Sequence, residues 1–441
     1  MRLAKRFAVF LAMAAATLAA APAFAATELV FWHAMPGKLG EWIGDLAQGF
    51  NASQPDYVIN PVYKGSYPET MNAALAAAKA GKPPHFVQVF EVGTATMMAA
   101  RDVIKPVHEV MGLLGQPFDD RAYMPAVTLY YSSLDGKLLS MPLNSSTPVV
   151  FFNKAAFAKA GLDPQAAPKT WPEVEQAAQA VLKSGGTCGF TTQWQSWIQL
   201  ENLSAWHDIP FATKQNGIGG YDIELKFNSP FHVRHVEQLA QWAKSRVFVP
   251  GGRRDEALGK FTRGECAMLF ATSATFAELR GANPDLSFGI GMLPYWPDIK
   301  WAPRNSIIGG ATLWVMNGHS NRDYQGIARF FEYISSPEIQ AASHQRTGYL
   351  PITREAYSLS RRQGFYDTHP ETEIAIKQIT LHRPTEFSRG VRLGNFVQIR
   401  DVIDEELEAV WAGKRDAKTA LDNAVARGNE LLRKFNREQG K

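Results

Sequence analysis

The first ninety residues alternate between two apolar patterns, and this alternation constrains the fold more than any other feature of the chain. Short apolar runs at 28–32, 57–63 and 85–90 predict three strands. Between them, apolar residues recur at helical spacing over 39–50 and 68–78. Strands that alternate with helices of this length favour right-handed crossovers and a parallel sheet. We therefore expect an α/β protein.

Polar or aromatic residues come at the end of each of these predicted strands. Trp32 and His33 end the first strand, residues 65–67 follow the second, and Glu91 comes directly after the third. Ligands of parallel sheets bind beyond the carboxyl ends of the strands. Each segment alone could be loop punctuation or rim packing, but all three at one edge predict a crevice for a small molecule.

Length and composition favour two lobes. The 441 residues exceed what one hydrophobic core usually serves, and a hydrophobic fraction of 46% supplies enough apolar side chains for two cores. The extended run 139–152 contains Pro142 and Pro148, which suits a strand that crosses between lobes better than a central strand. Two amphipathic helices are predicted near the end of the chain, at 403–411 and 421–435.

The first 25 residues have the pattern of an export leader. A basic head precedes an apolar run at 7–20, and the small residues Ala23 and Ala25 predict cleavage after Ala25. The apolar run is shorter than the roughly 20 residues that cross a bilayer. No cysteine near the cleavage point offers a lipid anchor, so we expect an exported and soluble mature protein.

Charge and cysteine content narrow the possible partners. Without the basic leader residues, the 46 Lys and Arg nearly balance the 42 Asp and Glu, which gives no support for binding to nucleic acid or an acidic membrane. Cys188 and Cys266 are the only cysteines. In an exported chain they could form one bridge, although two buried thiols too far apart to pair are an equally good interpretation.

No motif argues for catalysis, a metal or a cofactor. His232 and His235 come nearest to zinc-ligand spacing, but a solvated helix face explains them better. The chain contains no P-loop and no nucleophile elbow. With 42 carboxylates, chance pairs are certain, so counting alone leaves a glycosidase pair open.

Nine segments resemble the extracellular solute-binding proteins of ABC importers, and together they span nearly the whole chain after the leader. They are residues 31–33, 63–67, 91–98, 144–148, 168–171, 197–202, 308–311, 347–351 and 392–395. The resemblance implies a two-lobed periplasmic binding protein fold of type II, with a hinge of crossover strands. It divides the chain into an N-lobe first part at 26–142, a C-lobe first part at 143–298, an N-lobe return at 299–352 and C-lobe helices at 353–441.

Within this family, the segments are most similar to members that bind sn-glycerol 3-phosphate. The resemblance therefore implies a non-catalytic periplasmic receptor that closes on this ligand and delivers it to the permease and ATPase of an importer. Glycerophosphocholine or related glycerophosphodiesters are expected as further ligands, with Trp171 or Trp197 facing the quaternary ammonium. A monomer without metal or cofactor is expected.

The resemblance also implies where the ligand lies. It places the ligand between the lobes, against Tyr67, Glu91, Ser146, Thr272, Gly310, Tyr349 and Arg400. The family pattern has a serine where this chain has Thr272, so the hydroxyl of Ser273 is an alternative. The contact at Gly310 could equally be made by Gly309.

Physical roles for these residues follow from the charge of a phosphate ester. Arg400 is predicted to neutralise the phosphate, because its planar fork can donate two parallel hydrogen bonds. The start of the helix after Thr272 adds backbone donors. Glu91 would repel phosphate, so it is expected on the opposite wall, where it accepts hydrogen bonds from the glycerol hydroxyls. Trp171 is expected to form an apolar wall.

Other interpretations stay open for these residues. A single Arg near the chain end is commonly a surface or ion-pairing residue, and a Trp that opens a helix is commonly part of a core. The alternative functions are a maltose-like sugar receptor and, from another class, a secreted glycerophosphodiester hydrolase.

Overall fold

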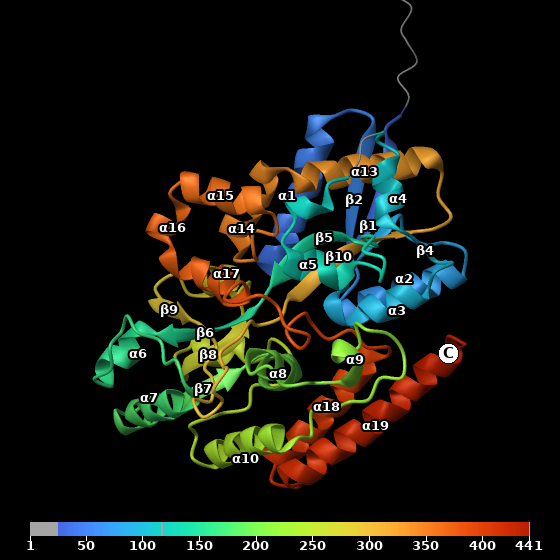
Figure 1. Cartoon of the computed structure of the whole chain (residues 1–441). Helices are drawn as coiled ribbons and strands as arrows, with labels where there is room; N and C mark the ends of the chain where they lie inside the picture. Colours follow the sequence, from blue (N-terminus) through green and yellow to red (C-terminus); the bar gives the residue numbers. More distant parts are fainter. Residues whose placement is uncertain (1–24, 116–117, 441) are drawn as a thin grey trace, which may run out of the picture.

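The computed structural model describes residues 25–115 and 118–440, and it divides into two lobes that each contain one sheet (Figure 1). Of the predicted leader at 1–25, residues 1–24 lie outside the described residues. None of the helices in the described part of the chain is both long and apolar enough to span a bilayer.

The sheet of the first lobe contains the three strands predicted from the alternating pattern. Its order is β2, β1, β3, β10 and β4, with β5 also paired to β10. The bounds are β1 Thr27–His33, β2 Tyr57–Tyr63, β3 Phe86–Phe90, β4 Ile104–Lys105, β5 Met141–Ser146 and β10 Gly309–Met316. Strands β1, β2 and β3 are parallel as predicted, whereas β10 runs antiparallel to β3, β4 and β5. The sheet is therefore mixed, because β10 returns from the other lobe rather than through a local crossover helix.

The sheet of the second lobe has the order β7, β8, β6 and β9. The bounds are β6 Pro148–Asn153, β7 Cys188–Thr192, β8 Cys266–Thr272 and β9 Phe288–Gly291. Strands β7 and β8 are parallel, and their register sets Cys188 opposite Cys266. The two cysteines form a disulfide with a Cα–Cα distance of 4.4 Å, which resolves the alternatives that the sequence left open.

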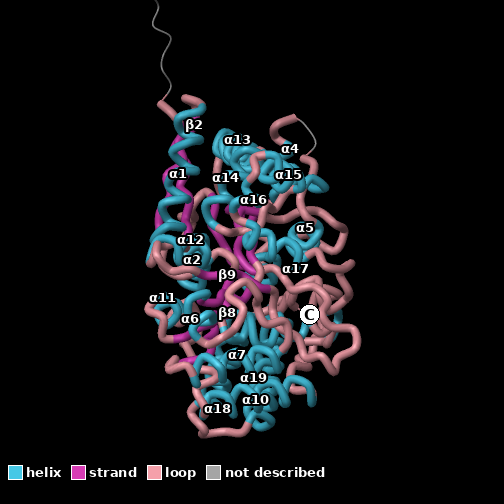
Figure 2. The backbone as a smooth tube through the Cα atoms, turned by 90° about the vertical axis from the view of Figure 1, so that its left-hand side faces the viewer, coloured by secondary structure: helices cyan, strands magenta, loops and turns pink. Residues whose placement is uncertain are grey.

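Helices enclose both sheets, as the tube view shows most clearly (Figure 2). Helix α1 buries the apolar face predicted for it, including Leu39, Trp42 and Phe50. The bounds in the first half of the chain are α1 Gly37–Ser53, α2 Tyr67–Lys79, η1 Glu91–Gly93, α3 Thr94–Ala99, α4 Val107–Gly112, η2 Asp120–Ala122, α5 Pro125–Tyr131, α6 Lys154–Lys159, α7 Trp171–Lys183, η3 Trp197–Asn202, α8 Leu203–Trp206 and α9 Thr213–Asn216.

The remaining helices complete the lobes. They are α10 Pro230–Lys244, α11 Leu258–Thr262, α12 Thr275–Ala282, α13 Asn321–Ser335, α14 Pro337–Thr347, α15 Arg354–Arg362, α16 Phe365–Thr368, η4 Pro370–Glu373, α17 Ile374–Ile379, α18 Phe396–Trp411 and α19 Ala417–Glu438. Helices α10, α18 and α19 gather at the far end of the second lobe (Figure 1). Helix α18 also contacts η1 of the first lobe, so it reaches across to the cleft.

The chain passes between the lobes at three places. The first is Thr147, between β5 and β6, so the first sheet holds the chain through Ser146 rather than to 142. The second is the segment 292–308 before β10, and the third lies between α14, which contacts α1 of the first lobe, and η4, which contacts β9 of the second lobe. Helices α15 and α16 contact α14 and each other, although the resemblance assigned everything after 352 to the C-lobe. The lobe boundaries as a whole stay a prediction.

A buried polar cluster ties these crossings together. The Thr147 hydroxyl lies 2.6 Å from the Ser306 hydroxyl and donates to the Ile307 carbonyl. Gln378, on α17, donates both to Ser306 and to the Pro148 carbonyl. The carbonyls of Ile307 and Pro148, which lie where the sheets end, thereby gain hydrogen-bond donors. These bonds link the two lobes at the base of the cleft.

Candidate functional site

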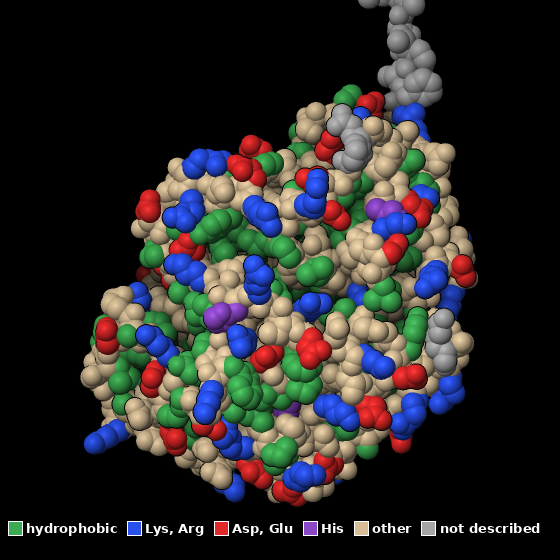
Figure 3. Space-filling model, viewed as in Figure 1, with side chains coloured by type: hydrophobic (Ala, Val, Ile, Leu, Met, Phe, Trp, Pro, Cys, Tyr) green, Lys and Arg blue, Asp and Glu red, His purple; other side chains and the backbone are tan. Residues whose placement is uncertain are grey.

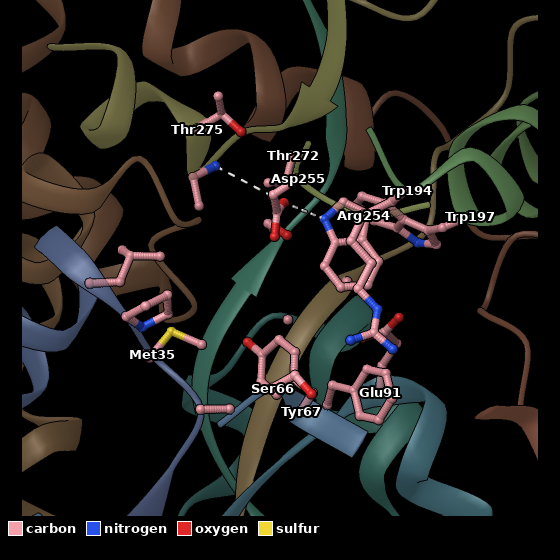
Figure 4. Close-up of a pocket in the computed structure, with 18 of the residues that line it drawn as sticks. Met35, Ser66, Tyr67, Glu91, Trp194, Trp197, Arg254, Asp255, Thr272 and Thr275 are labelled. Carbon is pink, nitrogen blue, oxygen red and sulfur yellow. Dashed lines mark hydrogen bonds between the residues drawn. The ribbon is translucent and has the colours of Figure 1, made fainter. Parts of the chain in front are cut away.

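A cavity of about 330 Å³ lies between the lobes, beyond the ends of β1, β2, β3, β5 and β8. The first lobe contributes Ala34, Met35, Pro36, Leu39, Tyr63, Ser66, Tyr67, Glu69, Phe90, Glu91, Ser146, Gly309, Gly310 and Tyr349. The second lobe contributes Trp194, Trp197, Arg254, Asp255, Thr272, Ala274, Thr275, Glu278 and Arg400. In Figure 4, Ser66 and Tyr67 lie across the cavity from Thr272 and Thr275.

The rule that ligands bind at the carboxyl ends of parallel strands predicted where the cavity lies. Not every residue that the rule indicated lines the cavity. Tyr67 and Glu91 line the cavity, whereas Trp32 and His33 do not. His33 is buried, and burial lowers its pKa to about 4. Lys64 covers the ring of Trp32 at 4.2 Å from the centroid. Both residues therefore have packing roles.

Arg400 and Glu91 form a direct ion pair, so the prediction that they occupy opposite walls is wrong. Nη2 of Arg400 lies 2.9 Å from Glu91 and 2.8 Å from Glu201, and Nε lies 2.7 Å from Glu201. The exposed fraction of each side chain is 9% or less. The cause is helix α18, which brings its first turns against η1 and so carries Arg400 to Glu91. Nη1 of Arg400 makes no hydrogen bond with any described residue.

Glu201 was missed from the sequence, although it lies in one of the segments that carry the family resemblance. It sits on the π-helical segment η3 and is 1% exposed. The signal was a single carboxylate in the run Trp-Ile-Gln-Leu-Glu-Asn, since a buried carboxylate needs a partner. Burial raises the pKa of Glu91, against the lowering effect of Arg400, and the charge of Glu201 raises it further.

Neutral hydroxyls form another part of the wall. Tyr67 stacks on Phe90 with ring centroids 5.1 Å apart, and its hydroxyl accepts a hydrogen bond from Asn144. Burial raises the pKa of both Tyr67 and Tyr349, so both phenols keep their protons and can donate. Ser146 ends β5 in the same cavity.

The two neighbouring residues that the sequence left open, Thr272 and Ser273, differ in their exposure to the cavity. Thr272 lines the cavity, whereas Ser273 is buried beside it and does not. Helix α12 begins just beyond, and Ala274 donates its backbone N–H to the Thr272 hydroxyl (Figure 4).

Gly309 and Gly310 both line the cavity, and neither position has room for a side chain. A Cβ at 309 would lie 2.6 Å from Trp197. Gly310 has φ +103°, and a Cβ there would lie 2.2 Å from the Asn144 carbonyl oxygen.

The prediction that Trp171 forms an apolar wall of the site is wrong. Trp171 is 3% exposed and stacks on Phe270 in the core of the second lobe, with centroids 5.3 Å apart. It opens helix α7, whose apolar face packs inward. Trp194 and Trp197 line the cavity instead, and the indole of Trp194 donates to Asp255 at 2.7 Å.

His232 and His235 are fully buried, not on a solvated helix face as predicted. Both ring nitrogens of His232 lie within hydrogen-bond distance of serine hydroxyls, those of Ser204 and Ser229. Nε2 of His235 lies 3.1 Å from the side-chain amide oxygen of Gln199, and Nδ1 accepts a hydrogen bond from the Trp296 indole N–H. These partners occupy the ring nitrogens that a metal would need.

A second histidine cluster lies outside the cavity. Possible ligand atoms of His85, His319 and Asp323 come within 4.8 Å of one another. Nδ1 of His85 accepts a hydrogen bond from the Val30 N–H, so the neutral ring carries its proton on Nε2. Because that protonated nitrogen is the only ring nitrogen of His85 left for a metal, the cluster makes a poor metal site.

Comparison with known proteins identifies the family. The sequence profile described as "Bacterial extracellular solute-binding protein" matches residues 45–371. The chain belongs to the bacterial extracellular solute-binding proteins. Among relatives of this solute-binding protein, the sn-glycerol-3-phosphate-binding periplasmic proteins UgpB of Yersinia pseudotuberculosis and Escherichia coli are 49% and 50% identical over 416 residues, 94% of this chain and of each relative.

Solved structures agree with the two-lobed fold. UgpB from Mycobacterium tuberculosis in complex with glycerophosphocholine has a TM-score of 0.78 at 21% identity, covering 93% of this chain and 99% of that one. Maltose-bound MalE3 of T. maritima has a TM-score of 0.75 at 16% identity, covering 92% and 100%. At these identities the likeness supports the fold and not the ligand.

Proposed function

We propose that this solute-binding protein is the periplasmic receptor of an ABC importer and captures sn-glycerol 3-phosphate between its lobes. It would deliver the ligand to the membrane permease and its ATPase. Relatives about half identical over 94% of both chains carry this ligand in their names. The observation that carries the assignment is the cavity itself, in which neutral hydroxyls stand beside a buried carboxylate and guanidinium pair.

The phosphate is best placed against the hydroxyls and the start of α12. The residues that would hold it are Tyr67, Ser146, Thr272, Gly310 and Tyr349. Phosphate oxygens only accept hydrogen bonds, and hydroxyls and backbone N–H groups donate them. The N-terminus of α12 adds a favourable partial charge.

The glycerol hydroxyls are best placed against Glu91 and Arg400. An oxygen of Glu91 can accept from one hydroxyl, and Nη1 of Arg400 can donate to its neighbour. The cluster of Glu91, Arg400 and Glu201 carries a net negative charge when both carboxylates are ionised, so phosphate is expected to bind away from it. This replaces the phosphate-neutralising role that the sequence suggested for Arg400.

Glycerophosphocholine is a second candidate ligand, and the aromatic and acidic lining of the second lobe favours it. Trp194 donates to Asp255, and Glu278 lies in the same wall. A quaternary ammonium is attracted both to aromatic faces and to carboxylates. A diester also keeps both glycerol hydroxyls for Glu91 and Arg400.

We further propose that the protein binds without turnover, works as a monomer and makes no use of nucleic acid. On the face drawn in Figure 3, basic and acidic side chains are interspersed, without the basic patch that nucleic acid binding requires.

Titration calorimetry of the purified protein tests the proposed function. We expect one site per chain for sn-glycerol 3-phosphate, with micromolar affinity or better, which corresponds to about −8 kcal/mol. Glycerophosphocholine should bind and be recovered intact, whereas maltose should release no heat. Binding of maltose alone would replace the phosphate assignment with a sugar receptor, and loss of intact glycerophosphocholine would indicate a hydrolase.

A further inference from the structure

Carboxylates outnumber cations in the cavity. Glu69, Glu91, Asp255 and Glu278 line it, and the two guanidinium groups are those of Arg400 and Arg254. Arg400 is held by two carboxylates, so its charge is already compensated. A phosphate monoester brings close to two negative charges and needs a cation when it leaves water. The cation that remains is Arg254.

Hydrogen bonds hold the backbone of Arg254, whereas its side chain has no hydrogen-bond or ion-pair partner within residues 25–115 and 118–440. It lies on the loop between α10 and α11, where its carbonyl accepts from the Trp194 N–H at 3.0 Å and its N–H donates to Glu256 at 2.7 Å. Its partly buried guanidinium makes no hydrogen bond or ion pair with any described residue, yet it lines the cavity. The adjacent Arg253 instead makes a bidentate pair with Glu408, at 2.6 and 2.7 Å.

The charge of Arg254 also acts across the cleft. Hydrogen bonds from Ser66 are the main cause of the lowered pKa of Glu69, and the charge of Arg254 contributes to the same lowering. Glu69 belongs to α2 of the first lobe, so the charge of Arg254 acts on a residue of the opposite lobe. Glu69 is itself held by the capping box at the start of α2.

We propose that Arg254 is the cation that pairs with the ligand phosphate and favours a doubly charged monoester over a singly charged diester. This assignment rests on the proposed function. It gives the two arginines different tasks: Arg400 is committed to the carboxylates and the glycerol end, and Arg254 compensates the phosphate. An arginine that forms no ion pair in the described part of the chain suits this task, because no such pair must be broken when the ligand enters.

The test compares wild-type protein with Arg254→Gln, Arg254→Lys and the matched control Arg253→Gln. Affinity is measured by titration calorimetry for sn-glycerol 3-phosphate and for glycerophosphocholine. Arg254→Gln should bind the monoester about 10- to 100-fold more weakly, the size expected for one charged hydrogen-bonded contact, and should lose less for the diester. Arg254→Lys should recover part of the loss, and Arg253→Gln should bind both ligands like wild type.

Two results would overturn the assignment. If Arg254→Gln binds the monoester within about twofold of wild type, another group compensates the phosphate. If it loses the same factor for both ligands and Glu69→Gln does likewise, Arg254 is a latch that closes the lobes. Thermal unfolding of each variant separates these results from misfolding. Wild-type protein that binds neither ligand would instead sink the proposed function itself.

Discussion

The buried cluster of Glu91, Arg400 and Glu201 shows how far single residues could be predicted. Glu91 and Arg400 were both expected at the ligand, and both line the cavity. Their mutual contact was not predictable, because it depends on where α18 crosses η1 and on Glu201 arriving from a third segment. The prediction that Trp171 lines the ligand site was wrong for a related reason. A Trp at the start of a helix does not indicate from sequence alone whether it faces a core or a cleft.

Replacing Glu201 tests whether this cluster holds the glycerol end of the site. Glu201→Gln keeps the shape but removes one of the two carboxylates that hold Arg400. We expect a loss of about 1–3 kcal/mol in the free energy of unfolding, together with weaker glycerol 3-phosphate binding, because a charged hydrogen bond is lost in a buried place. Urea unfolding and titration calorimetry measure both effects.

The control is Glu405→Gln, which removes an exposed carboxylate paired with Arg427. Ion pairs on the surface contribute little to stability. Glu405→Gln should therefore change neither the free energy of unfolding nor the affinity for glycerol 3-phosphate appreciably. Equal behaviour of the two variants would contradict a special role for Glu201.

Glu278 predicts a dependence on pH. Burial, followed by the charge of Asp255, raises the pKa of Glu278 from 4.5 to about 7. A carboxyl whose pKa is raised by folding stabilises the folded state fully below pH 4.5 and loses that contribution as pH rises through about 7. Above that pH, the ionised group also repels a phosphate in the same cavity.

Glu278→Gln should therefore flatten the fall in stability between about pH 5 and pH 8. It should also tighten glycerol 3-phosphate binding more at about pH 8 than at about pH 5. Thermal unfolding and calorimetry at both pH values check this, with the exposed Glu265→Gln as control. An identical change in affinity at the two pH values would show that Glu278 does not titrate beside the ligand.

At the scale of elements, the periodicity of apolar residues predicted those strands and helices that local interactions determine. The strands β1 to β3, the helix faces of α1 and α2, and the amphipathic helices α18 and α19 all followed from periodicity. The antiparallel direction of β10 and its place in the first sheet did not, because both depend on the chain returning from the other lobe. The crossing at Thr147 was expected only to within several residues, since β5 and β6 form one nearly continuous extended run.

The polar cluster at the crossings predicts an energetic coupling between chain segments. Thr147→Val keeps the side-chain shape but removes the hydroxyl that contacts Ser306 and the Ile307 carbonyl. We expect the free energy of unfolding to fall by about 1–3 kcal/mol, because the buried hydrogen-bond partners of the hydroxyl are left unsatisfied. A double-mutant cycle with Ser306→Ala in urea should show a coupling of about 0.5 kcal/mol or more. Strictly additive losses would mean that the two crossings are energetically independent.

At the scale of the whole molecule, sequence predicted two lobes and one possible disulfide, and the structure contains both. The pairing of Cys188 with Cys266 could not be decided from the sequence, because it requires β7 and β8 to be neighbours. The shape of the cavity could not be predicted either, since its lining comes from segments scattered between Ala34 and Arg400.

Removing the disulfide should destabilise the second lobe. The bridge joins residues 78 positions apart, and a cross-link over such a loop contributes about 2–4 kcal/mol, mainly by restricting the unfolded chain. The double variant Cys188→Ala, Cys266→Ala should unfold at lower urea than oxidised wild type. In strong reductant the difference should shrink, since wild type then loses the same constraint. Identical unfolding curves without reductant would contradict the bridge.

We infer that one glycerol phosphate binds between the lobes with its hydroxyls at Glu91. The most direct measurement is a calorimetric titration of sn-glycerol 3-phosphate into wild-type protein and into Glu91→Gln. We predict one molecule bound per chain in wild type and an affinity at least about tenfold lower in the variant. A wild-type protein that releases no heat with ligand at millimolar concentration would contradict the account.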